Sequence, residues 1–206
     1  MSAVPQSLLP SAPRPLTVRE YLDLERTAEF KSEYLDGVVY AMAGASRQHN
    51  IAKENLIGEL HARFKGGPCQ SYSSDQRVKV GPGNLFVYPD IAVVCGQVET
   101  APEDDETIVN PQVVVEVQSP STSRIDVQVK LRKYCRLDSV REVVLVSQEE
   151  PSVVVVSRLS DGDGRLSIVD GLDAILTLPS LGVSIPLADI YRNVAFAPPP
   201  GETPPG

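Results

Sequence analysis

The chain has 206 residues, of which 42% are hydrophobic and 22% charged, and its formal net charge is −8. This length and composition fit one globular domain that buries a core of its own. The acidic balance argues against non-specific nucleic-acid binding driven by counterion release, which needs a basic face, so any contact with DNA must be local, metal-assisted or weak.

The two ends of the chain read as tails around one domain. Residues 1–16 and 197–206 are rich in proline and small polar residues, a composition that buries too little to order itself. We expect residues 17–196 to form the domain. No run approaches the ~18 apolar residues of a membrane span, and the first residues lack a signal peptide pattern, which predicts a cytoplasmic protein without a membrane partner.

Local signals predict two helices and a hairpin in the first third of the chain. Thr17-Val18-Arg19-Glu20 is a capping-box pattern that opens a helix to about Thr27, and Ser46 caps a long helix to about Lys65. Between them, Asp36-Gly37 joins two short strands as a hairpin turn. His49 lies near the start of the second helix, where a polar helix residue is the favoured interpretation over a proton-transfer or substrate contact.

The rest of the chain alternates predicted strands with turns. We expect strands between Cys69 and Val80, after Pro89, over Val113–Gln118, over 143–146 and 153–156, and a last short helix at 187–191. Residues 101–110 contain the acidic run Glu103-Asp104-Asp105-Glu106, which predicts a solvated loop.

The three cysteines predict no cross-link and no zinc site. Cys69, Cys95 and Cys135 are odd in number, far apart in sequence and without a CxxC pair. This pattern is typical of reduced cytosolic thiols in strands or helices.

One apolar run carries a charge that needs an explanation. Val113–Gln118 lies between prolines and reads as a buried strand, yet it contains Glu116, which requires a cation or a set of donors. The two-residue period of a strand puts Glu116 and Gln118 on one face. A buried ion pair is the competing interpretation.

A second acid and a helical stripe accompany this strand. Asp90 follows a proline at the entrance of another apolar strand, where it is either a turn residue or a site residue. Ser121-Thr122-Ser123 predicts a helix cap, and Asp126, Lys130 and Tyr134 then recur at four-residue spacing on one stripe. Asp126 is as consistent with helix capping as with a site.

Taken together, these motifs resemble the Uma2 family of bacterial restriction-endonuclease-like proteins, a branch of the PD-(D/E)xK nuclease superfamily. The resemblance covers most of the chain between the tails. The residues that carry it are Glu33–Gly44, His49-Asn50, Pro89-Asp90, Glu116–Thr122, the Asp126, Lys130 and Tyr134 stripe, and Tyr191.

The resemblance implies an α/β fold with a restriction-endonuclease-like, mixed and mainly antiparallel sheet flanked by helices. It also implies a metal-dependent endonuclease that hydrolyses DNA phosphodiester bonds with Mg²⁺ or Mn²⁺. The implied catalytic residues are Asp90, Glu116 and Lys130, the implied metal ligands are Asp90, Glu116 and Glu33, and the residues implied to support them are Gln118, Asp126 and Tyr134.

The chain departs from the superfamily at Gln118, where a lysine would complete the Glu-x-Lys motif. The resemblance implies that Lys130 takes that role from the following helix. Without the resemblance, Glu33 reads as a solvated edge charge.

A second function class stays open: a nuclease-fold module that binds a partner or a nucleic acid with weak or no cutting. For an enzyme that cuts both strands of a duplex, a homodimer with a two-fold axis is expected.

Overall fold

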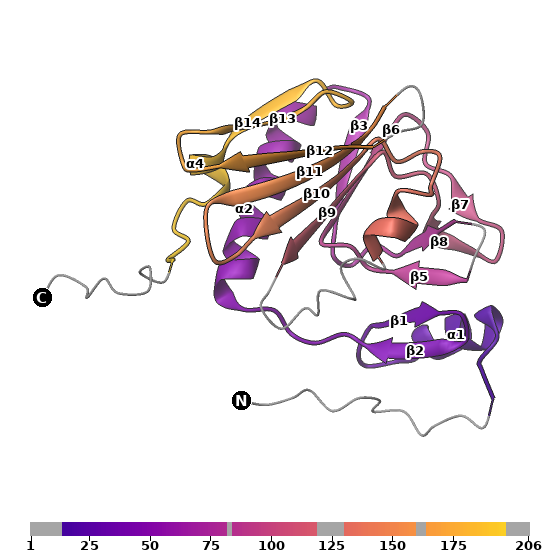
Figure 1. Cartoon of the computed structure of the whole chain (residues 1–206). Coiled ribbons are helices and arrows are strands. Elements are labelled where there is room, and N and C mark those ends of the chain that lie inside the picture. Colours follow the sequence, from indigo (N-terminus) through magenta and orange to yellow (C-terminus); the bar gives the residue numbers. More distant parts are fainter. Residues whose placement is uncertain (1–13, 82–83, 119–129, 160–163, 197–206) are drawn as a thin grey trace, which may run out of the picture.

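A computed structural model describes residues 14–81, 84–118, 130–159 and 164–196 (Figure 1). Its helices are α1 (Val18–Glu25), α2 (Arg47–Phe64) and α4 (Leu187–Ile190), and residues 130–134 are also helical. The strands are β1 (Ser32–Leu35), β2 (Val38–Ala41), β3 (Cys69–Ser73), β4 (Val78–Val80), β5 (Leu85–Val87), β6 (Ile91–Cys95), β7 (Thr100–Ala101), β8 (Asp104–Ile108), β9 (Val113–Gln118), β10 (Glu142–Ser147), β11 (Ser152–Arg158), β12 (Gly164–Asp170), β13 (Ile175–Leu178) and β14 (Val183–Pro186).

The strands form two six-stranded sheets and one two-stranded sheet. Sheet A has the order β2-β1-β5-β4-β8-β7, and sheet B has the order β12-β11-β10-β9-β6-β3. In sheet B, β9 and β10 are parallel while every other pairing is antiparallel. The predicted α/β fold with a mixed, mainly antiparallel sheet is confirmed, but the sequence did not separate the strands into two sheets.

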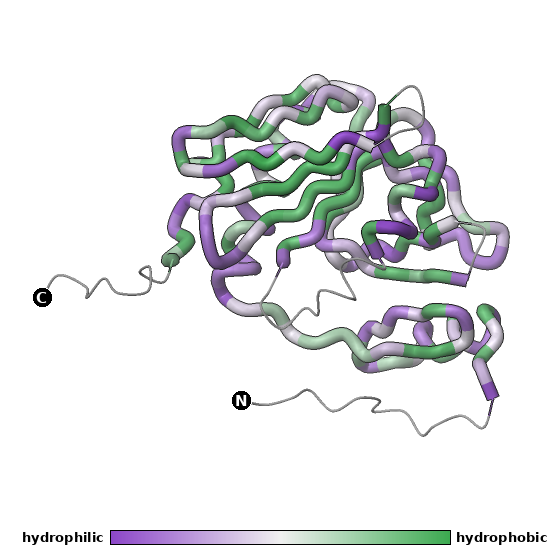
Figure 2. The backbone as a smooth tube through the Cα atoms, in the orientation of Figure 1, coloured by the Kyte–Doolittle hydropathy of each residue, from purple (hydrophilic) through white to green (hydrophobic). Residues whose placement is uncertain are grey.

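Sheet B is the middle layer. One of its faces packs against α2, α4 and the β13–β14 pair, and the other packs against sheet A and the segment around Tyr134 and Leu137. Figure 2 shows β9, β10 and β11 as strongly hydrophobic strands, and β9 and β10 are buried on both faces for most of their length. Any charged side chain on these strands is therefore exceptional.

The predicted caps and turns are present. Thr17 and Glu20 form the capping box of α1, and the hydroxyl of Ser46 accepts a hydrogen bond from the backbone N–H of His49 at the start of α2. Asp36 and Gly37 both have positive φ, at 47° and 98°, as the two-residue turn between β1 and β2 requires.

Residues 101–110 are not the solvated loop that the acidic run predicts. They contain β7 and β8, and the side chain of Asp104 is buried against Arg77, whose Nη2 donates to Asp104 Oδ2 at 2.6 Å. The same guanidinium donates to Thr107 and to Tyr88, and Tyr88 donates to Glu25 of α1 at 2.5 Å. The buried guanidinium of Arg77, which directly precedes β4, pairs with one of the four acids inside the fold, and the acidic run alone does not predict this partner.

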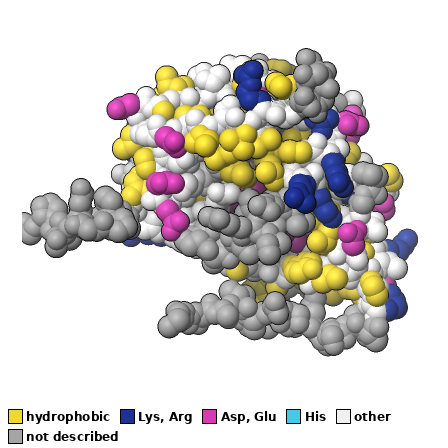
Figure 3. All heavy atoms as spheres, viewed as in Figure 1, with side chains coloured by type: hydrophobic (Ala, Val, Ile, Leu, Met, Phe, Trp, Pro, Cys, Tyr) yellow, Lys and Arg dark blue, Asp and Glu magenta, His cyan; other side chains and the backbone are white. Residues whose placement is uncertain are grey.

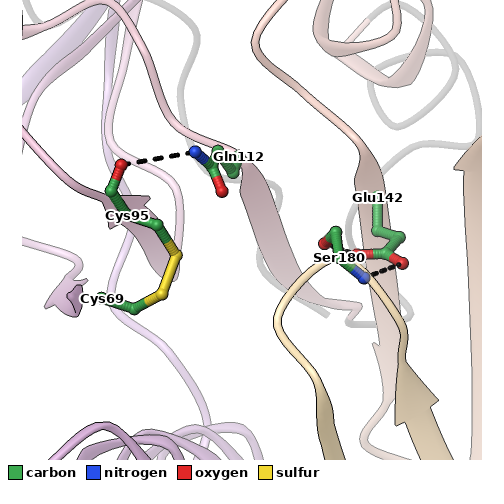
Figure 4. The surroundings of a disulfide bond; sticks show 5 residues. All are labelled: Cys69, Cys95, Gln112, Glu142 and Ser180. Carbon is green, nitrogen blue, oxygen red and sulfur yellow. Dashed lines mark hydrogen bonds between the residues drawn. A yellow bond between two sulfur atoms is a disulfide. The ribbon is translucent and has the colours of Figure 1, made fainter. Parts of the chain in front are cut away.

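The expectation of three reduced thiols is wrong for two of them. Cys69 and Cys95 face each other on the antiparallel strands β3 and β6, with their Cα atoms 3.9 Å apart, and they form a disulfide (Figure 4). Their separation of 26 residues hid this contact, because the register of two strands cannot be read from spacing. Cys135 is free.

The predicted tails lie mainly outside the described residues. The described part of the chain starts at Arg14, and Leu16 donates its backbone N–H to the carbonyl of Gly37 at 2.9 Å. The division into tails and one domain over 17–196 stays a prediction. Among the described residues, none of the helices combines the length and apolar character needed to cross a membrane.

Candidate active site

Asp90 directly precedes β6, and Glu116 lies on β9, the strand next to β6 in sheet B. β6 and β9 pair antiparallel with Ile91 opposite Val115. Continuing that register by one residue sets Asp90 opposite Glu116, so both side chains leave the sheet on the same face. Glu116 and Gln118 are partly exposed on that face, while Val115 is fully buried on the other. The polar strand face that the sequence predicts is present.

Both oxygens of the Asp90 carboxylate are held by the protein. Its Oδ2 accepts the backbone N–H of Val117 at 2.8 Å, and its Oδ1 lies 2.9 Å from Nε2 of His49. His49 reaches Asp90 from the first turn of α2, which the Ser46 cap fixes at its start. The side chains of His49 and Asp90 are only 12% and 13% exposed, so the contact is inside the fold rather than on its surface.

Lys130 and Tyr134 bring the helical segment 130–134 to the same place. The ammonium of Lys130 lies 2.7 Å from Oε1 of Glu33 on β1, and the hydroxyl of Tyr134 donates to Oε1 of Glu116 at 2.7 Å. One helical turn separates Lys130 from Tyr134, which explains why both point to the same side. Five segments far apart in sequence therefore contribute to one cluster, namely β1, the start of α2, the residue before β6, β9 and residues 130–134.

Among the described residues, negative charge outweighs positive charge in the cluster. The pKa of Glu116 is raised to about 7, mainly by burial and also by the nearby carboxylates of Asp90 and Glu33, while Lys130 and the Tyr134 hydroxyl oppose the rise. Burial also raises the pKa of Tyr134 well above its usual value, which keeps its hydroxyl protonated as a donor. Three carboxylates with one ammonium form a site in which a further cation relieves repulsion.

The donors suit a hard divalent ion. Carboxylate oxygens are the ligands that Mg²⁺ and Mn²⁺ prefer. Oε2 of Glu116 and Oε2 of Glu33 accept no hydrogen bond from another described residue, whereas one oxygen on each group is engaged. No three His, Cys, Asp or Glu side chains within the described parts of the chain already form a metal-binding group.

Two parts of the predicted site cannot be placed. Asp126 and the predicted cap at Ser121–Ser123 lie outside the described residues. The structure brings together Glu33, Asp90, Glu116 and the Lys130–Tyr134 turn, with Gln118 further along the same strand face. Their catalytic and metal-binding roles stay predictions.

The sequence family is shown by a profile match. Residues 18–188 match the Uma2 family, described as "Putative restriction endonuclease". The chain belongs to the Uma2 family. The match spans every element of the cluster, from Glu33 to Tyr134.

One relative of this Uma2 protein matches nearly its whole length, and a second matches about two thirds of it. The uncharacterized protein slr1290 of Synechocystis sp. is 33% identical over 188 residues, covering 91% of this chain and 97% of that protein. A second uncharacterized Synechocystis protein, sll1609, is 29% identical over 133 residues, covering 65% of this chain and 75% of its own length. Neither name states a function.

A solved structure shares the fold. The crystal structure of "a putative nuclease belonging to DUF820 from Anabaena variabilis" has a TM-score of 0.72 and 18% sequence identity, covering 86% of this chain and 98% of that one. The likeness supports the restriction-endonuclease-like architecture of this Uma2 protein at the level of the fold.

His49 is the residue of this Uma2 site that the sequence reasoning undervalued. It lies 41 positions before its partner Asp90, and a histidine in the first turn of a helix has many uses. Only the family likeness, which includes His49-Asn50, singled it out. The contact with Asp90 shows that His49 is a member of the cluster rather than an isolated surface residue.

Proposed function

We propose that this Uma2 protein is an endonuclease that hydrolyses DNA phosphodiester bonds with Mg²⁺ or Mn²⁺. The observation that carries the proposal is the register of sheet B, which sets Asp90 beside Glu116 on one face, together with Lys130 and Glu33 at the same end of the strands. Membership of a family described as "Putative restriction endonuclease" supports the same chemistry.

Asp90, Glu116 and Glu33 would hold the divalent ion through their carboxylate oxygens. When bound, the ion supplies a water of lowered pKa and offsets charge on the scissile phosphate. The hydrogen bonds to Asp90 from His49 and from the backbone of Val117 fix the orientation of that carboxylate. Tyr134 does the same for Glu116.

Lys130 would orient or deprotonate the attacking water. It would take the role of the motif lysine, whose position in this chain is occupied by Gln118. Its side chain is 20% exposed and its ammonium lies 2.7 Å from Oε1 of Glu33, so this ion pair holds the ammonium beside the cluster. Gln118, on the strand face beside Glu116, would support the site without acting on the proton.

The test is a cleavage assay on plasmid and oligonucleotide DNA with Mg²⁺, with Mn²⁺ and with EDTA. We expect cleavage with either ion and none with EDTA, and we expect Asp90→Asn and Glu116→Gln to remove it. Metal-independent cleavage, or full activity in both variants, would rule the mechanism out. Gln118→Lys combined with Lys130→Met tests the lysine exchange, because the strand lysine should recover part of the rate.

A second candidate function is a nuclease-fold module that binds a nucleic acid or a protein without cutting. The net charge of −8 and the glutamine at position 118 favour it. A thermal-shift titration with Mn²⁺ separates the two functions. A stabilisation that Glu116→Gln abolishes favours the enzyme, and its absence in both proteins favours the module.

We also propose that the protein forms a homodimer through β12. This edge strand has no partner on its outer side within the described residues, and Leu166 and Ile168 are 62% and 60% exposed on it. Antiparallel pairing about Ser167 would set Leu166 of each copy against Ile168 of the other, as a two-fold axis requires. The same pairing would bring Arg165, near the start of β12, close to Asp170 at the end of β12 in the other copy.

Light scattering at micromolar concentration tests the dimer. We expect the unaltered protein to have twice the mass of one chain and Ile168→Arg to have the mass of one chain. A monomer mass for the unaltered protein would contradict the proposal. Ile175→Arg is the matched control, because Ile175 is 56% exposed on the separate strand β13.

We further propose a cytoplasmic location, where a reducing environment would open the Cys69–Cys95 bond.

A further inference from the structure

The β1–β2 hairpin has one face toward α1 and one toward the candidate site. Tyr34 and Val39 pack with α1 in a small core of their own, whereas Leu35 packs at the margin of the core between the two sheets. Glu33 shares a strand face with Leu35 and forms the ion pair with Lys130. The Glu33 face is therefore the site face of the hairpin.

Val38 and Tyr40 lie on this site face but are left open. In the antiparallel register of the hairpin, Leu35 is opposite Val38 and Glu33 is opposite Tyr40, so the opposed side chains leave on the same side. Val38 is 48% exposed and Tyr40 is 51% exposed. An exposed aromatic ring thus stands directly beside a candidate metal ligand.

The hairpin is tied to the helical segment that carries Lys130. Lys130 pairs with Glu33 at 2.7 Å, and Lys133 lies 3.6 Å from Asp36 in the hairpin turn. Figure 3 shows hydrophobic side chains gathered over this hairpin and Lys and Arg side chains above them on the same face of the molecule. These two ion pairs join the hairpin that carries Tyr40 to the helical segment that carries Lys130.

A phosphodiester positioned at the cluster carries a nucleoside on each side, so the surface next to Glu33 meets a sugar or a base. The chain is acidic overall, and phosphate contacts alone would give it little affinity for a nucleic acid. Stacking of a base on an aromatic side chain does not depend on net charge and is tolerant of sequence. An open tyrosine ring beside the cluster supplies such a platform.

We propose that Tyr40 stacks an unpaired base next to the scissile phosphate, so that the preferred substrate is single-stranded or has an unpaired segment. This inference rests on the proposed function for the position of the phosphate. A base inside an intact duplex is already stacked on its neighbours and cannot lie on the ring. Within the described residues, β2 is an edge strand of sheet A and has no strand on its outer side.

The experiment measures binding rather than cleavage. The full chain with Lys130→Met, which keeps the three carboxylates of the cluster, is titrated in Mg²⁺ against a fluorescein-labelled single strand and the matching blunt duplex. A third titration uses a single strand that contains 2-aminopurine, whose fluorescence falls on stacking. Tyr40→Ala and Tyr40→Phe are then added to that background. Ile175→Ala is the control for loss of an exposed apolar side chain elsewhere, since Ile175 is 56% exposed on β13.

We expect Tyr40→Ala to weaken single-strand binding by about 10-fold, within the range for losing one stacked base, and to abolish the 2-aminopurine quenching. Tyr40→Phe should keep both, because it keeps the ring. The loss should persist at high salt, unlike the loss of a phosphate contact. Unchanged binding in Tyr40→Ala, an equal loss in Tyr40→Phe, or equal affinity for the blunt duplex would overturn the inference.

The two proposals fail in different ways. If the unaltered protein does not cleave DNA but Tyr40→Ala weakens single-strand binding and removes quenching, the nuclease proposal falls and the stacking role stands. If the unaltered protein cleaves with Mg²⁺ and Tyr40→Ala binds and quenches normally, only the stacking role falls.

Discussion

Replacing Glu116 by glutamine should stabilise the protein at alkaline pH. Glu116 is partly buried and lies near the carboxylates of Asp90 and Glu33. Burial and these two charges raise its pKa from 4.5 to about 7. The glutamine keeps an oxygen that accepts the hydrogen bond of Tyr134 but carries no charge. The substitution therefore removes the repulsion and leaves the packing nearly unchanged.

The size and sign of the effect follow from proton linkage. Between pH 4.5 and pH 7 the folded chain holds a proton on Glu116 that the unfolded chain has released. The free energy of unfolding of the unaltered protein therefore falls as the pH rises through this window and is lowest above it. A shift from 4.5 to about 7 corresponds to a cost of at most about 3 kcal/mol, which is an upper limit because the side chain is partly exposed and is coupled to Asp90.

Urea unfolding without divalent ions at pH 5 and at pH 8 measures this effect. Glu116→Gln should be nearly as stable as the unaltered protein at pH 5 and more stable at pH 8, by up to about 3 kcal/mol. Glu142→Gln is the contrast, because the buried Glu142 carboxylate accepts hydrogen bonds from the backbone and hydroxyl of Ser180 and should lose stability when its charge is removed (Figure 4).

The reasoning fails if Glu116→Gln is no more stable than the unaltered protein at pH 8. It also fails if the gain is the same at pH 5, because a gain without pH dependence would come from packing and not from ionisation. If metal binding or cleavage depends on Glu116, this carboxylate would serve activity while lowering the stability of the fold. Such a conflict between activity and stability is common at functional sites.

Three further outcomes are expected. Lys130→Met should leave folding intact and lower cleavage by about 100-fold or more, the scale of losing a positioned acid–base group, and an unchanged rate would make this lysine a structural partner of the fold only. Arg77→Met should lower the free energy of unfolding by about 3 kcal/mol in urea titrations, because it removes the nearest cation from the buried Asp104 carboxylate and leaves only Arg26, at 3.6 Å. Reduction of the Cys69–Cys95 bond should cost about 3 kcal/mol for the chain segment that it closes, and Cys135→Ser should show the same loss on reduction.

The features that sequence reasoning predicted well depend on neighbouring residues. The capping box at Thr17, the helix start at Ser46 and the Asp36-Gly37 turn are each fixed by side chains within a few positions, so they are readable without tertiary contacts. The valine-rich strands were readable because burial on both faces leaves no polar alternation.

The features that it missed depend on which strands become neighbours. The sequence has no signal that divides the strands into two sheets, places Cys69 opposite Cys95 or turns Asp104 toward Arg77. The pair β13–β14 was missed because its strands are only four residues long and alternate buried with exposed positions over too short a range.

The candidate site falls between these cases. Glu116 was recognisable because a carboxylate within a valine strand is costly unless something meets it, and Asp90 because it opens an apolar strand after a proline. The contacts from Glu33 to Lys130, across 97 positions, and from His49 to Asp90 required the fold. The residue types could be predicted, while the partners could not.

The most direct test of the central claim is a crystal soaked in Mn²⁺ and measured at a wavelength where manganese scatters anomalously. We expect one strong anomalous peak within coordination distance of the Asp90 and Glu116 carboxylates, about 2.2 Å from the nearest oxygens, and no such peak in Glu116→Gln. A peak elsewhere, or Asp90 and Glu116 without an ion at saturating Mn²⁺, would contradict the shared metal site.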